Sequence, residues 1–347
     1  MVPLPTDIVL CIGEYCNRNE LCMLSLLSKA SCDGIAPSLY HDVILRNRKS
    51  IDSFCNAIIN GRVALRNYPR TVSFSPRVTP IKTLNALSPQ MRQALALMID
   101  LADLTLALPS KIVKAIFRDA RFGFTLRRFS CPLIAHTKFN RFLLEQSMIQ
   151  DLVILGDVRG KINLETLIRN PDGNLLPNLE FVSANYDTLS ALIPGRPTRH
   201  ISTGTALLAV PHFQTFGATL AQSSTPIHSL SVCICCAPFL LGAVVNHLFE
   251  SLNENQVFPR TLSMALVFPE NTPSDRRMVY PHIQECLQLM KIGDLDGLEV
   301  LEISARDCPC PLKTEFHCIA NEVALLPCWT GSCPSLRQVI LFGKPLE

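Results

Sequence analysis

The chain of 347 residues has a mass of 38.5 kDa, is 48% hydrophobic and 18% charged, and has a mean hydropathy of +0.24. This composition excludes an intrinsically disordered chain and predicts extensive burial, in two ordinary domains or in one small and one extended domain. The net charge is only +3, but residues 41–141 carry seventeen Lys and Arg against five Asp and Glu, whereas residues 250–347 carry eight against thirteen.

The first residues predict an apolar helix. Thr6 can cap a helix in which Ile8, Ile12 and Tyr15 or Cys16 recur at helical spacing. We do not expect a signal peptide, because the segment lacks a basic start and Asp7 and Glu14 interrupt it; these are the only two acidic residues before Asn19.

A second and a third helix are expected before residue 42. Asn19 can cap the second, which is apolar over most of its circumference; its apolar residues are Leu21, Met23, Leu24, Leu26 and Leu27. The third is short and contains Ile35 and Leu39, after which the chain becomes extended. Three short helices cannot bury so many apolar groups among themselves, so another surface must cover them.

Residues 41–141 form the basic stretch. Such a stretch can contact nucleic acid or an acidic protein. We interpret it as a solvated face and expect no nucleic-acid partner, because aromatic residues are not interleaved with the charges at stacking positions.

Beyond residue 70, short extended segments alternate with helical ones. The expected strands are 71–74, 103–108, 125–131, 151–156, 178–183, 198–203, 228–234, 260–266, 298–304 and 336–343. The expected helices are 88–99, 109–121, 136–147, 212–223, 238–252, 280–292 and 315–326; the first two have Ser88 and Ser110 as their caps, and Pro89 takes the first helical position of the first.

When one residue is chosen from each expected strand, successive chosen residues lie 20 to 39 positions apart in the sequence. The residues chosen are Val72, Leu104, Phe129, Val153, Phe181, Ile201, Leu230, Leu262, Leu301 and Val339. This alternation predicts an α/β solenoid with a curved parallel sheet, in which each unit packs on its neighbours. The rival is a doubly wound α/β fold, which the number of strands and the absence of a glycine-rich phosphate turn disfavour.

The run Leu230–Phe249 is long enough to span a membrane. Pro238 interrupts it, and no basic residues flank it, so we expect a buried strand followed by a buried helix and no membrane partner.

No catalytic motif, phosphate-binding loop or paired-carboxylate motif appears, so we expect no enzyme and no cofactor. The fifteen cysteines include no pair of CxxC motifs at zinc spacing, and we expect free, mostly buried thiols in a reducing compartment and no metal. A zinc site would need some of Cys308, Cys310, Cys318, Cys328 and Cys333 to fold together.

Residues 4–45 resemble the F-box motif. Leu4 and Pro5 match its entry, Ile8 and Ile12 its first helix, and Leu21, Leu24 and Leu27 its second; Leu39-Tyr40 stands where many members have Leu-Trp. The segment Leu27–Ser31 replaces the usual Val-Cys-(Arg/Lys)-x-Trp. The remainder is similar to a degenerate leucine-rich-repeat array, through phrases such as "PNLEFVSA" and "PSLRQVILF".

This resemblance implies an F-box at residues 1–45, a joining linker or helix at 46–70 and a leucine-rich-repeat-like solenoid at 71–347. It implies a substrate receptor of an SCF-type ubiquitin ligase in the cytoplasm or nucleus, which binds the Skp-family adaptor and cullin complex and an unknown protein target. The adaptor-binding residues would be Leu4, Pro5, Ile8, Val9, Ile12, Leu21, Leu24 and Leu27. The alternative is a repeat scaffold without a ligase role, whose N-terminal helices only cap the solenoid.

Overall fold

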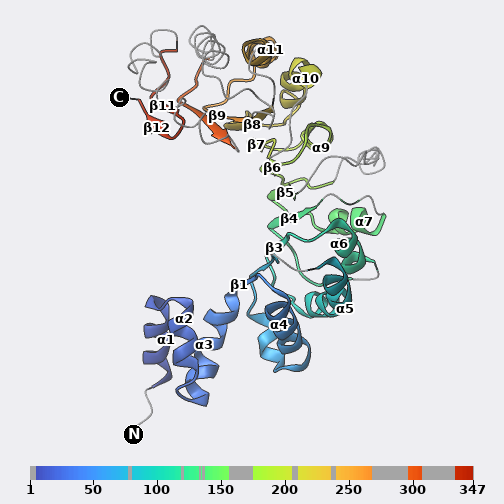
Figure 1. Cartoon of the computed structure of the whole chain (residues 1–347), viewed down its shortest axis with the longest axis vertical. Helices are drawn as coiled ribbons and strands as arrows, with labels where there is room; N and C mark the ends of the chain where they lie inside the picture. The colour runs from blue at the N-terminus through green and yellow to red at the C-terminus, as the bar shows by residue number, and fades with distance from the viewer. Residues whose placement is uncertain are drawn as a thin grey trace. The chain divides into compact units, whose positions relative to one another are not determined.

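The computed structural model (Figure 1) describes residues 5–76, 80–118, 121–132, 134, 137–155, 175–204, 210–235, 240–267, 296–306 and 333–346. These residues form a mixed α/β protein whose strands are mostly parallel, as the alternation predicted. The chain forms two compact units: unit 1 contains residues up to 155, and unit 2 contains residues from 177 on.

Unit 1 begins with three helices and continues as strand–helix repeats. Its elements are α1 (Thr6–Tyr15), α2 (Arg18–Ser25), α3 (Lys29–His41), β1 (Asp42–Leu45), α4 (Arg48–Asn60), the 3-10 helix η1 (Val63–Asn67), β2 (Thr71–Phe74), α5 (Ile81–Leu97), β3 (Asp103–Leu106), α6 (Ser110–Phe117), β4 (Arg128–Pro132), α7 (Thr137–Glu145) and β5 (Asp151–Leu155). The segment 46–70, expected to join two domains, therefore contains α4 and η1, and four residues of α4 are buried: Ile51, Phe54, Cys55 and Ile58.

The strands of unit 1 pair in parallel in chain order, and α4, α5, α6 and α7 lie on one side of them (Figure 1). The register places five buried residues in one row: Val43, Val72, Leu104, Phe129 and Leu152. Because side chains alternate along a strand, the residues before and after each of these face the opposite, open side.

Unit 2 continues the same pattern. Its described elements are β6 (Phe181–Ser183), α9 (Tyr186–Leu192), β7 (His200–Ser202), α10 (Val210–Leu220), β8 (Ser229–Cys235), α11 (Leu241–Glu254), β9 (Thr261–Val267), β10 (Val300–Arg306), β11 (Gln338–Leu341) and β12 (Lys344–Pro345). Strands β6 to β11 pair in parallel in chain order, and β12 pairs with β11 in the antiparallel direction. Their buried row is Val182, Ile201, Leu230, Leu262, Leu301 and Val339.

All ten strands expected beyond residue 70 are present, with ends shifted by a few residues. Two of the residues chosen to represent them are off by one position, since Leu152 and Val182 occupy the buried row in place of Val153 and Phe181. Within each unit the described strands follow chain order, whereas a doubly wound sheet reverses its order at a switch point. The described strands therefore disfavour the doubly wound alternative.

The apolar run Leu230–Phe249 consists of β8 and α11 where it is described, as expected. No helix in the described parts of the chain is long and apolar enough to cross a membrane. The helices expected at 280–292 and 315–326 lie outside the described residues.

Several helix starts differ from the expected ones. α1 and α6 follow Pro5 and Pro109 without a side-chain cap, so Thr6 and Ser110 are their first residues. α5 starts at Ile81, and Pro89 lies inside it. Pro89 has no N–H to donate to the carbonyl of Asn85, four residues earlier. The Ser88 hydroxyl donates to that carbonyl instead, at 2.8 Å. Ser88 thus compensates for the proline inside the helix.

Gln146 joins the end of α7 to the segment that precedes β4. It is buried, its side-chain oxygen accepts a hydrogen bond from the Leu126 N–H at 2.7 Å, and its side-chain nitrogen donates to the Phe124 carbonyl at 3.1 Å. Both contacts are buried, so Gln146 satisfies two main-chain groups that water cannot reach.

Replacing Gln146 by leucine should lower the free energy of unfolding by about 1–3 kcal/mol for each main-chain group that loses its partner. Urea unfolding followed by circular dichroism measures this change. The exposed Gln150 provides the control, and Gln150→Leu should change stability by less than about 0.5 kcal/mol. Equal effects of the two substitutions would contradict the bridging role of Gln146.

Candidate protein-interaction site

The three N-terminal helices have a small core of their own. Val9 of α1, Leu21 of α2 and Ile35 of α3 are buried together, and three partly buried residues pack on them: Cys16, Leu24 and Leu39. Local hydrogen bonds fix the starts of α2 and α3. Asn17, rather than the expected Asn19, caps α2 in a reciprocal capping box with Glu20, and Ser28 caps α3.

The structure divides the expected adaptor-binding residues into two groups. Val9 and Leu21 are buried and hold the helices together, and Leu24 is half-buried against them. The exposed members are Pro5, Ile8, Ile12 and Leu27, with exposed fractions of 47%, 39% and 66% for the last three. Leu4 lies outside the described residues.

Three further apolar side chains join the exposed group. Tyr15 of α1 is 90% exposed, Met23 of α2 is 67% exposed, and Leu26 at the end of α2 is 79% exposed. Ile8, Ile12 and Tyr15 are spaced i, i+4 and i+7, so they lie on one face of α1. We call the six residues Ile8, Ile12, Tyr15, Met23, Leu26 and Leu27 the N-terminal apolar patch.

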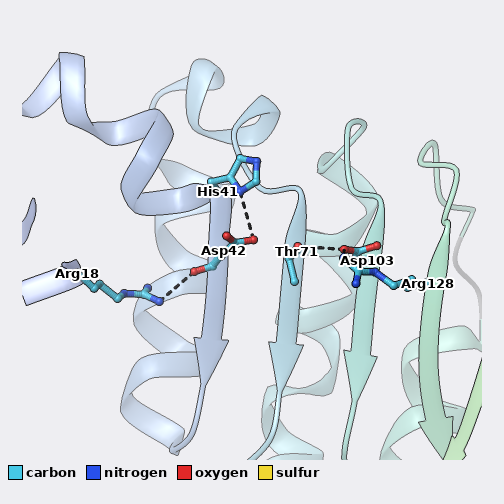
Figure 2. Close-up of polar contacts among 6 residues, drawn as sticks. All are labelled: Arg18, His41, Asp42, Thr71, Asp103 and Arg128. Carbon is cyan, nitrogen blue, oxygen red and sulfur yellow. Dashed lines mark hydrogen bonds and ion pairs between the residues drawn. The ribbon is translucent and has the colours of Figure 1, made fainter. Parts of the chain in front are cut away.

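Polar contacts attach this helical unit to the sheet. The Arg18 guanidinium of α2 donates to the Asp42 carbonyl of β1 at 3.0 Å (Figure 2). Arg62, which precedes η1, forms an ion pair with Asp33 of α3. These contacts connect the helices to the first strand and to the segment that follows α4.

A row of polar residues begins at this junction. Asp42, Thr71, Asp103, Arg128 and Asp151 are the first residues of β1 to β5 and are aligned by the strand register. His41 contacts Asp42 at 3.2 Å, Thr71 donates to Asp103 at 3.2 Å, and Arg128 pairs with Asp103 at 2.5 Å (Figure 2).

The charges in this row stabilise one another. Partial burial by itself would raise the pKa of Asp42, but the neighbouring Thr71 hydroxyl, His41 and Arg128 outweigh it and lower the pKa below its usual value. The hydrogen bond and ion pair with Asp103 raise the pKa of Arg128. The row is therefore an ionised, hydrogen-bonding strip, suited to contact polar groups of another molecule.

No protein-family model matches the chain, and no curated protein matches it in sequence.

Eight cysteines whose side chains are described are free and differ in exposure. Cys11, Cys22 and Cys32 are exposed and Cys16 is intermediate; the buried ones are Cys55, Cys131, Cys233 and Cys333. Four of the eight cysteines whose side chains are described are thus buried. Burial raises the pKa of Cys55 to about 12, which keeps its thiol protonated.

Within the described ranges no three His, Cys, Asp or Glu residues are grouped to hold a metal ion. Of the five cysteines considered for zinc, only Cys333 is described.

Proposed function

We propose that the chain is a substrate-recognition adaptor of an SCF-type ubiquitin ligase in the cytoplasm or nucleus, with a binding role and no catalysis of its own. In this proposal α1 to α3 form an F-box that binds the Skp-family adaptor of the cullin complex. The observation that carries it is the N-terminal apolar patch, which lies on the segment whose sequence resembles the F-box.

The patch supports an interface because exposing large apolar side chains to water is unfavourable in free energy, and a bound partner would remove that exposure. Fully burying a large apolar side chain contributes about 1.5–3 kcal/mol, Ile8, Ile12 and Tyr15 lie on one face of α1, and exposed apolar patches mark interaction sites on soluble proteins. The core of Val9, Leu21 and Ile35 orders the helices without covering the patch. The helices are thus folded by one set of apolar residues and left with another set available to a partner.

The remaining elements form the target-binding region of this proposal, a leucine-rich-repeat-like solenoid. The pairing of each described strand with the next within a unit supports it, because repeat arrays bury each unit against its neighbours. Small hydroxyl side chains recur on the open side of the strands, one residue beyond the buried row. They are Ser73, Thr105 and Ser130 in unit 1 and Ser202, Ser231 and Ser263 in unit 2; Ser183, at the same position of β6, is buried. Such a surface leaves room for the side chains of a protein target.

Mixing the full chain with purified Skp adaptor tests the proposal. Size-exclusion chromatography with light scattering should show a complex of one chain with one adaptor. Two folded proteins that elute separately at micromolar concentration would overturn the ligase role. That outcome would favour the repeat scaffold whose N-terminal helices serve only as a cap.

A further inference from the structure

Among the described strands, none pairs with the outer edge of β1. In the sheet order β1 is the first strand, and its described neighbour is β2. The Leu45 carbonyl accepts a hydrogen bond from the Ser75 N–H at 2.9 Å, so the main chain of Leu45 faces β2. Because peptide groups of successive residues point in opposite directions, those of Asp42, Ile44 and Arg46 face away from β2. The bond from Arg18 to the Asp42 carbonyl, on that outer side, agrees with this geometry.

A groove follows this edge. Its volume is about 650 Å³, and it is bounded by α2, α3, β1 and the start of α4. Its apolar wall includes Leu39, Tyr40 and Phe54, and the Tyr40 ring stacks on Phe54 with ring centroids 6.4 Å apart. Burial raises the pKa of Tyr40, so its hydroxyl remains a hydrogen-bond donor. Ile44, 50% exposed, adds an apolar side chain at the edge itself.

The charged residues that line the groove are both positive. Arg18 and Arg46 are exposed and line it, and none of its lining residues is acidic. Arg48 and Lys49 occupy the first turn of α4, which has no acidic residue. Cations at a helix N-terminus oppose the helix dipole, so this arrangement favours a negatively charged ligand.

We propose that this groove binds an extended, acidic peptide segment of a partner protein, which adds to the outer edge of β1 as a further strand. Main-chain hydrogen bonds to Ile44 would supply affinity, as in other cases of strand addition, and the groove would select the side chains. Alternate residues of the segment would place apolar side chains against Tyr40 and Phe54 and carboxylates near Arg18 and Arg46. This proposal does not rest on adaptor binding by the N-terminal apolar patch.

The four residues of β1 span about 13 Å at about 3.3 Å per residue, so a peptide of about six residues covers the edge. The probe is a fluorescein-labelled peptide of the sequence Glu-Val-Glu-Val-Glu-Val, titrated with the full chain and followed by fluorescence anisotropy. The Lys-Val peptide of the same length is its charge-reversed control. We expect at least tenfold weaker binding of the Lys-Val peptide, and affinity for the Glu-Val peptide that falls as salt rises.

Two variants separate specific docking from general attraction to a basic protein. Arg46→Glu should weaken binding of the Glu-Val peptide at least tenfold. Arg127→Glu, at an exposed arginine outside the groove, should change it less than twofold. Equal losses in the two variants would overturn the docking site, because the attraction would then come from the overall charge of unit 1.

Hydrogen exchange distinguishes strand addition from a purely electrostatic contact. Saturating Glu-Val peptide should slow exchange of the Ile44 amide at least tenfold, since that N–H becomes hydrogen-bonded. The Val43 amide, which faces β2, provides the internal control and should change little. Binding without protection of Ile44 would overturn the proposal, and so would displacement of the peptide by an equimolar single-stranded oligothymidine.

Discussion

Replacing Ile12 by aspartate should weaken binding to the Skp adaptor at least about a hundredfold while leaving the chain folded. Ile12 is 39% exposed and lies between Ile8 and Tyr15 on one face of α1. A carboxylate at this position would have to lose its water in the complex without gaining a partner, which is strongly unfavourable. Isothermal titration calorimetry measures the loss, and circular dichroism checks that the fold is retained.

Two other substitutions to aspartate make the result specific. Ile81 is 55% exposed at the first position of α5, where an acidic residue is favoured, so Ile81→Asp should bind the adaptor like the unchanged chain. Val9 is 3% exposed, so Val9→Asp should unfold the helical unit as well as abolish binding. If Ile12→Asp behaves like Val9→Asp, α1 is a structural cap; if it behaves like Ile81→Asp, the patch is not the adaptor interface.

The alternation of strands and helices was predictable because each strand has a local signal of its own. A segment such as 151–156 is short and mostly apolar, with Gln150 before it and Asp157 after it, and residues 151–155 form a strand in the structure. Which side of the sheet each residue of a strand faces was less predictable. In β5, Leu152, Val153, Ile154 and Leu155 are all apolar, so the pattern does not identify which of them lies in the buried row. Pairing with β4 selects Leu152.

Helix starts were harder to predict because several residues compete for the cap. Asn17 and Asn19 are both good caps, and only Asn17 has a glutamate three residues later, at Glu20, to complete a capping box. This signal is present in the sequence and could have been used. The position of Pro89 inside α5 has no such local signal, because it depends on packing that buries Leu84, Leu87 and Met91 on both sides of the proline.

The candidate site was predictable as a segment but not residue by residue. Helical spacing groups Ile8, Ile12 and Tyr15, but it does not show that Val9 turns inward to meet Leu21 and Ile35. That division follows from how three helices pack, which is a tertiary property. The groove beside β1 gave no sequence signal at all, since it is formed by residues from α2, α3, β1 and α4.

Replacing Phe142 by alanine should lower the free energy of unfolding by about 3–5 kcal/mol. Phe142 of α7 is buried and contacts five other phenylalanine rings of unit 1, with centroid distances from 4.7 Å to 6.5 Å. These rings are Phe117, Phe122, Phe124, Phe129 and Phe139. The substitution removes the ring that joins α6, α7, β4 and the segment before β4, and the resulting cavity cannot close without moving several elements.

Phe122 provides the control within the same cluster. It is half-buried and contacts three of the rings, so Phe122→Ala should cost clearly less than Phe142→Ala in urea unfolding followed by circular dichroism. Both variants should still bind the Skp adaptor under conditions where they are folded, because the cluster lies in the strand–helix part of unit 1 and the N-terminal apolar patch lies on α1 and α2. Equal destabilisation by the two substitutions would show that Phe142 is not the central ring. Loss of adaptor binding in the folded Phe142→Ala variant would show that binding depends on the sheet as well as on the helices.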